Sequence, residues 1–82
     1  MTICIDERTY KGSAAEIMEQ LRQQTFDPTE YPDTESYIHQ LRSNFIRATD
    51  LECDLPESSV EGQARAMFAH LAKAGALTIL EE

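Results

Sequence analysis

Extended and helical patterns occupy different parts of this chain, and their order limits the folds that it can adopt. Residues 2–6 alternate with a period of two, which places Ile3 and Ile5 on one face of a strand. Residues 9–11 and 77–80 are also expected to be extended. Between these ends, apolar residues recur at helical spacing in three stretches. The predicted order is therefore strand, strand, helix, helix, helix, strand.

The first helix has a clear start signal. Gly12 ends the second strand, and Ser13 and Glu16 have the spacing of a capping box, in which two side chains satisfy backbone N–H groups at a helix start. We expect this helix to run to about Thr25. Residues 26–32 contain two prolines, which favour neither a helix nor a regular strand, and are expected to form a linker.

The other two helices have similar signals. Asp33 or Thr34 can cap the second helix, which is predicted to run to about residue 48. Ser58 and Glu61 repeat the capping-box spacing before the third helix, predicted over about 59–74. Gly75 then supplies the left-handed residue at which helices commonly stop.

These elements predict an α+β fold. A chain of 82 residues has room for one core, so we expect a single small globular domain over residues 1–82. The N-terminal hairpin and the C-terminal strand form a three-stranded sheet, in the order second, first, last, which the three helices cover on one face. The direction of the last strand relative to the first stays open. A turn at Glu7 and Arg8 would place Ile5 opposite Tyr10.

The helical stripes also predict the core. Each helix contributes four apolar residues on one face. They are Ala14, Ile17, Met18 and Leu21 in the first helix, Ile38, Leu41, Phe45 and Ala48 in the second, and Ala64, Met67, Phe68 and Leu71 in the third.

The acidic residues are strongly localised. Nine of the fifteen carboxylates lie in two segments without Lys or Arg, and the other six face seven basic residues, so these segments account for the net charge of -8. The nine are Asp27, Glu30, Asp33 and Glu35, then Asp50, Glu52, Asp54, Glu57 and Glu61. Two acidic inter-helix loops on a nearly neutral domain favour a partner with a basic surface.

Part of this charge has a local explanation. Acids near a helix start interact favourably with the positive end of the helix dipole, which accounts for Glu35, Glu57 and Glu61. The residues that this effect does not explain are the candidate partner-binding residues. They are Asp27, Glu30, Asp50, Glu52 and Asp54.

One metal-site pattern needs to be weighed. Asp50, Glu52, Asp54 and Glu61 occupy positions 1, 3, 5 and 12 of a twelve-residue calcium loop, and on those positions they resemble an EF-hand. Position 6, which requires Gly for a sharp turn, is Leu55. The two histidines and Cys53 also lack zinc-ligand spacing. We therefore expect neither a metal nor another cofactor.

Composition narrows the function classes further. The chain lacks an apolar run long enough to span a bilayer and a signal-peptide pattern, so we expect a cytoplasmic protein without membrane contact. Two cysteines are too few for a disulfide framework, so free thiols are expected. Direct nucleic-acid binding is disfavoured because Lys and Arg are few and dispersed. Catalytic residues are not apparent, and we expect a non-enzymatic protein.

The sequence thus predicts a small acidic protein-interaction domain whose inter-helix loops meet a basic partner surface. The alternative is an inhibitor that mimics nucleic acid and occupies the basic groove of a DNA- or RNA-processing protein. The sheet face with Thr2, Cys4, Thr9, Lys11, Thr78 and Leu80, or a sheet edge, could also form a homodimer.

Overall fold

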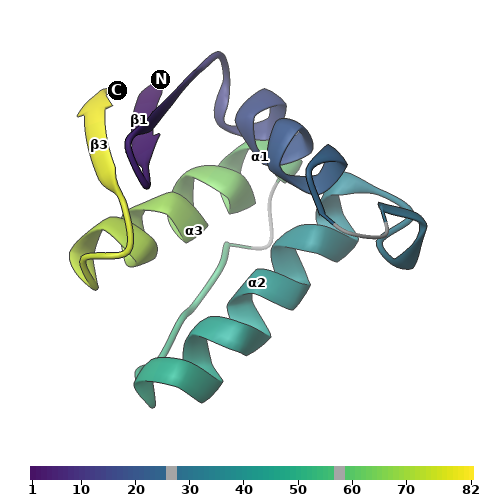
Figure 1. The fold of residues 1–82 in the computed structure, drawn as a ribbon. Helices are drawn as coiled ribbons and strands as arrows, with labels where there is room; N and C mark the ends of the chain where they lie inside the picture. The colour runs from purple at the N-terminus through teal and green to yellow at the C-terminus, as the bar shows by residue number, and fades with distance from the viewer. Residues whose placement is uncertain (26–27, 57–58) are drawn as a thin grey trace.

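Three helices and a three-stranded sheet make up the fold, as predicted (Figure 1). The structure, a computed structural model, describes residues 1–25, 28–56 and 59–82. The elements are β1 (Thr2–Ile5), β2 (Arg8–Lys11), α1 (Ala14–Gln23), the 3-10 helix η1 (Pro28–Glu30), α2 (Thr34–Thr49), α3 (Val60–Lys73) and β3 (Thr78–Glu81). The α+β class and the order of elements are therefore confirmed.

The sheet has the predicted order β2-β1-β3, and both pairings are antiparallel. Ile3 at its centre pairs with Tyr10 on one side and Ile79 on the other. The direction of the last strand is thereby settled, and the two chain termini lie close together beside β1 and β3 (Figure 1). Leu80 is the extra residue where the register between β1 and β3 shifts, and it is 57% exposed.

The predicted hairpin register was wrong by two residues. Ile5 pairs with Arg8, so the turn consists of Asp6 and Glu7, whose φ angles are 49° and 69°. Two central residues with positive φ are the requirement of a type I′ turn, which matches the twist of the strands. A shift of two residues leaves every side chain on the same face, so alternation alone could not distinguish the registers.

One hydrophobic cluster joins the sheet to the helices. Each helix contacts the other two, and α3 also contacts β3. The fully or almost fully buried residues are Ile3, Tyr10, Ala14, Ile17, Met18, Ile38, Phe45, Cys53, Ala64, Met67, Phe68 and Leu77. Leu21, Leu41 and Leu71 are partly buried against them. Ala48 was predicted to be buried but is exposed, because it lies in the last turn of α2, which projects past the other helices (Figure 1).

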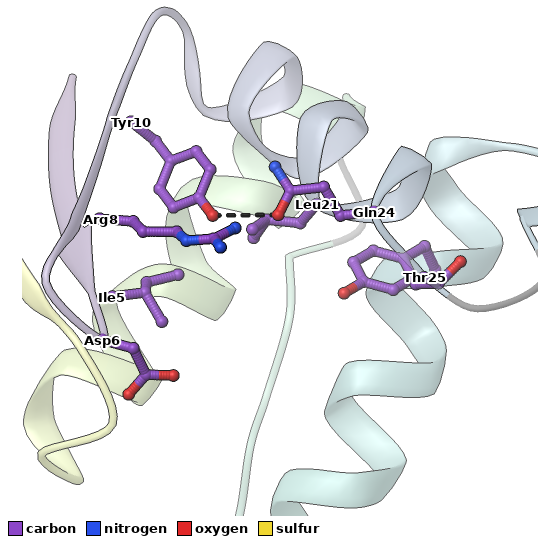
Figure 2. A pocket seen from close by; sticks show the side chains of 8 residues that line it. Ile5, Asp6, Arg8, Tyr10, Leu21, Gln24 and Thr25 are labelled. Atoms are coloured by element: carbon purple, nitrogen blue, oxygen red, sulfur yellow. Dashed lines mark hydrogen bonds between the residues drawn. The ribbon is translucent and has the colours of Figure 1, made fainter.

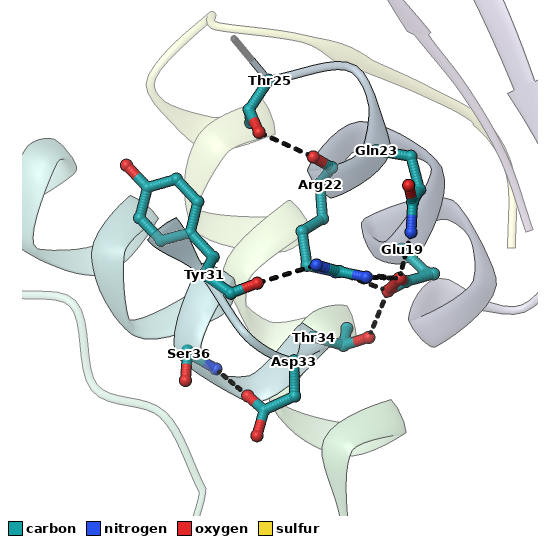
Figure 3. Close-up of polar contacts among 8 residues, drawn as sticks. All are labelled: Glu19, Arg22, Gln23, Thr25, Tyr31, Asp33, Thr34 and Ser36. Atoms are coloured by element: carbon teal, nitrogen blue, oxygen red, sulfur yellow. Dashed lines mark hydrogen bonds and ion pairs between the residues drawn. The ribbon is translucent and has the colours of Figure 1, made fainter. Parts of the chain in front are cut away.

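Polar contacts fix how α1 sits against its neighbours. The Tyr10 hydroxyl donates to Oε1 of Gln24 at 3.1 Å, which ties β2 to the C-terminal end of α1 (Figure 2). Nη1 of Arg22 donates to the Tyr31 carbonyl at 2.7 Å, and its Nη2 donates to Glu19 at 2.6 Å. The Thr34 hydroxyl donates to the same carboxylate at 2.8 Å, so Glu19 joins the end of α1 to the start of α2 (Figure 3).

This network makes the fold sensitive to acid. Hydrogen bonds from Arg22 and then Thr34 lower the pKa of Glu19 from 4.5 to about 2. A depressed folded-state pKa stabilises the fold above the unfolded-state value, and this contribution is lost as the pH falls from 4.5 toward 2. Because the Glu19 side chain is 36% exposed, solvent screening reduces the contribution to about 1 kcal/mol.

We expect Glu19→Gln to weaken this acid sensitivity. Urea unfolding at pH 6 and pH 3 measures it, and the wild-type protein is predicted to lose about 1 kcal/mol more than the variant on acidification. Glu81→Gln, which changes an exposed carboxylate of β3, is the control and should keep the wild-type pH dependence. Equal pH dependence in the wild type and Glu19→Gln would contradict the prediction.

Among the residues that the structure describes, no helix combines the length and apolar character needed to cross a membrane.

Cys4 and Cys53 are free thiols, as expected.

Candidate functional site

The candidate partner-binding residues do not form one cluster. Asp27 lies outside the described residues. Glu30 is exposed in η1, just before α2, whereas Asp50, Glu52 and Asp54 follow the other end of that helix. With 16 residues and a rise of 1.5 Å per residue, α2 is about 24 Å long. The structure therefore brings Asp50, Glu52 and Asp54 together on one segment and leaves Glu30 apart.

Two other acids of these segments have structural roles at helix starts. Asp33 caps α2, and its carboxylate accepts from the Ser36 amide at 2.8 Å, which lowers the pKa of Asp33. Glu61 accepts from the amides of Ala14 and Ala15 at 3.1 and 2.8 Å. It thus caps α1, a helix 46 residues earlier in the chain. These hydrogen bonds, the one from Ala15 first, lower the pKa of Glu61.

The predicted capping box of Ser58 and Glu61 was wrong. Ser59 is the N-cap of α3 and accepts from the Gly62 amide, while Ser58 lies outside the described residues. Glu61 is one residue too early for the box, and the positive N-terminus of α1 attracts its carboxylate instead.

The carboxylate of Asp50 does not cap a helix N-terminus as those of Asp33 and Glu61 do. It is the C-cap of α2 in the left-handed conformation, with φ 57°, and its amide donates to the Ile46 carbonyl at 2.8 Å. Glycine and asparagine fit this position better, and a carboxylate at the negative end of a helix dipole is unfavourable. The left-handed conformation suits Asp better than most residues with a side chain, but the helix dipole gives no reason for an acid at position 50.

Side chains from two helices hold the segment that follows. Cys53 is buried, and its carbonyl accepts from Nε of Arg42 in α2 at 2.6 Å. Nε2 of His70 in α3 lies 3.1 Å from the carbonyl oxygen of Asp54. Because the backbone is anchored on the protein side, the side chains of Glu52 and Asp54 remain exposed.

Glu52 also lines a hollow of about 310 Å³ between the C-terminal parts of α2 and α3. It is lined by Phe45, Leu51, Glu52, His70, Lys73 and Ala74. Phe45 is almost fully buried, whereas Leu51 is 54% exposed and is one of two large hydrophobic residues with such exposure in the described parts of the chain. We call this hollow, together with Asp50 and Asp54, the acidic groove.

The apolar part of the acidic groove was missed in the sequence. Phe45 was predicted as a core residue, whereas Leu51 was not among the residues expected to contribute apolar surface. His70 is partly buried, and its ring lies 6.1 Å from the Phe45 ring. The available signal was a leucine between Asp50 and Glu52, a large apolar side chain in the middle of a charged loop.

The other candidate chemistry gains no geometric support. In residues 1–25, 28–56 and 59–82, no three His, Cys, Asp or Glu side chains are grouped so that they could hold a metal ion. Glu61 occupies the last of the four calcium-loop positions. Its carboxylate accepts from the Ala14 and Ala15 amides at the start of α1 and does not join Asp50, Glu52 and Asp54. Burial raises the pKa of the Cys53 thiol, which disfavours the reactive thiolate.

No protein-family model matches the sequence, and searches of curated proteins and of solved structures also find no match.

Proposed function

We propose that this protein is a non-enzymatic interaction domain that binds a basic segment of a partner protein in the acidic groove. The observation that carries the proposal is the combination of three exposed carboxylates, Asp50, Glu52 and Asp54, with an apolar hollow. An apolar partner side chain would contact Leu51 and Phe45, and Lys or Arg residues beside it would pair with the carboxylates.

Charge complementarity supports a partner with a basic surface. Glu52 and Lys73 both line the hollow, and the exposed carboxylates of Asp50 and Asp54 on the same segment make the acidic groove more acidic than basic. Charged rim contacts steer association and select partners more than they add affinity. The apolar contact with Leu51 would supply the larger part of the binding free energy, because it removes exposed apolar surface from water.

The alternative of nucleic-acid mimicry has less support. A mimic of a phosphate backbone requires carboxylates along one continuous surface. Asp33 and Asp50 cap opposite ends of α2, and Glu61 is used to cap α1. The described carboxylates therefore favour one local groove over an extended charged surface.

A peptide-display selection tests the proposal directly, because random peptides sample many possible partner sequences. The peptides are selected on the wild-type protein and on a groove variant with Asp50→Asn, Glu52→Gln and Asp54→Asn. We expect the wild type to enrich peptides with Lys or Arg next to a large apolar residue. Each exposed ion pair is worth about 0.5 kcal/mol, so the groove variant should bind these peptides about tenfold more weakly.

A matched control separates local recognition from net charge. The control variant carries Glu30→Gln, Glu35→Gln and Glu81→Gln, which remove the same charge from exposed residues outside the groove. It should select the same peptides as the wild type, with similar affinity. Leu51→Ser should weaken binding with little effect on stability, because Leu51 is 54% exposed. Equal loss in the groove and control variants, or enrichment of peptides without basic residues, would contradict the proposal.

A further inference from the structure

A second hollow lies between the β1–β2 hairpin and the C-terminal end of α1 (Figure 2). It is lined by Ile5, Asp6, Arg8, Tyr10, Leu21, Gln24, Thr25 and Tyr37, and its volume is about 530 Å³. This lies within the range of about 300–1,000 Å³ that is usual for small-molecule sites. None of these residues lines the acidic groove.

The inner wall of this hollow is apolar and well fixed. Tyr10 is 8% exposed, and Ile5 and Leu21 pack against the core. The hydrogen bond from the Tyr10 hydroxyl to Gln24 holds both side chains in place. Such a wall can accept the apolar or aromatic part of a ligand without rearrangement.

Arg8 supplies a charged group at the same place. Its side chain extends under the Tyr10 ring toward Leu21 and Gln24 (Figure 2). Among residues 1–25, 28–56 and 59–82, Arg8 has no hydrogen-bond or ion-pair partner. By contrast, Arg22, Arg42 and Arg65 all bind acceptors of the chain. An arginine without a partner among the described residues, in a chain of net charge -8, is available to a ligand.

Gln24 adds a second donor. Its Oε1 accepts from Tyr10, so its amide NH₂ group is left to donate to a ligand oxygen. Guanidinium and amide donors together match the oxygens of a carboxylate or a phosphate. The Asp6 carboxylate lies at the rim beyond Ile5, on the side away from Gln24 (Figure 2).

We propose that this hollow, the Arg8 pocket, binds a small molecule that carries a carboxylate or phosphate next to an apolar or aromatic body. Arg8 and the Gln24 amide bind the anionic group. Tyr10, Leu21 and Ile5 contact the apolar body. This binding does not depend on the function proposed for the acidic groove.

Titration with four small aromatic probes, followed by backbone amide NMR shifts, tests the pocket. Benzoate and phenyl phosphate carry the required anion, whereas benzyl alcohol is neutral and benzylamine is cationic. At about 0.15 M ionic strength, we expect a Kd on the order of a few millimolar for the tighter anion, with shifts at residues of the Arg8 pocket. The tighter of the two anions identifies the preferred anionic group. Benzyl alcohol and benzylamine should bind at least about tenfold more weakly.

Paired variants decide whether Arg8 is responsible. Arg8→Gln should weaken binding of the tighter anion about tenfold or more, while Arg47→Gln, which makes the same charge change at an exposed residue of α2, should not alter it. Unchanged NMR shifts elsewhere show that each variant is folded. The proposal is overturned if neither anion binds at about 20 mM, well above the expected Kd, if benzyl alcohol binds as tightly as benzoate, or if both arginine variants behave alike.

Discussion

Replacing Glu61 with alanine is expected to lower the free energy of unfolding by about 2 kcal/mol, because two part-buried helix amides lose their acceptor. The first backbone N–H groups of α1 are divided between two caps. Ser13 and Glu16 form a local capping box, and Glu61 accepts from Ala14 and Ala15. A domain of this size has a total stability of roughly 4–12 kcal/mol, so the loss is a large fraction of it.

Urea unfolding of three variants measures this effect. Glu61→Gln retains an oxygen acceptor but not the charge, and is expected to fall between the wild type and Glu61→Ala. Glu35→Ala is the control, because Glu35 also lies in the first turn of a helix but accepts no backbone amide of another helix among the contacts of the described residues. If Glu61→Ala and Glu35→Ala cost the same, the long-range cap does not contribute as proposed.

Replacing Arg42 with methionine is expected to cost about 2 kcal/mol and to loosen the acidic segment. Nε of Arg42 donates to the Cys53 carbonyl at 2.6 Å, a contact that joins α2 to the chain segment beside Glu52 and Asp54. Methionine keeps much of the apolar stem but removes the donor, so the carbonyl loses its charged partner.

The expected readout is local as well as global. Hydrogen exchange of amides near Cys53 should become faster in Arg42→Met, in addition to the loss of stability in urea. Peptides selected on the wild type should bind this variant more weakly, because the carboxylates are no longer held beside Leu51 and Phe45. Arg47→Met, at an exposed residue of the same helix, should leave hydrogen exchange near Cys53 at the wild-type rate. Unchanged exchange near Cys53 would contradict the role given to Arg42.

Local signals predicted the elements well, since each depends on residues that are near in sequence. Ser13 and Glu16 begin α1 as expected, Asp33 caps α2, and Gly75 follows α3 with a φ of 84°. The sheet order was predicted by pairing β3 with the first strand of the hairpin, and the order β2-β1-β3 confirms it. The hairpin register was missed because a shift of two residues preserves alternation.

The candidate site was predicted only in part. Asp50, Glu52 and Asp54 were identified as acids without a local explanation, and they do lie together on one exposed segment. The apolar groove beside them could not be predicted, because it forms where residues of α2 and α3 meet that segment. The Arg8 pocket is similar, since its wall combines a hairpin with the end of α1.

The sequence by itself determined the type, order and approximate ends of the elements, and the uneven distribution of charge. These properties depend on periodicity, capping and composition, which act over a few residues. Only the tertiary structure decided that β3 runs antiparallel to β1 and that Glu61 caps α1. It also decided which acids lie beside apolar surface, as Glu52 does beside Leu51. The physical reason is that these contacts join residues distant in sequence, whose proximity depends on how the whole core packs.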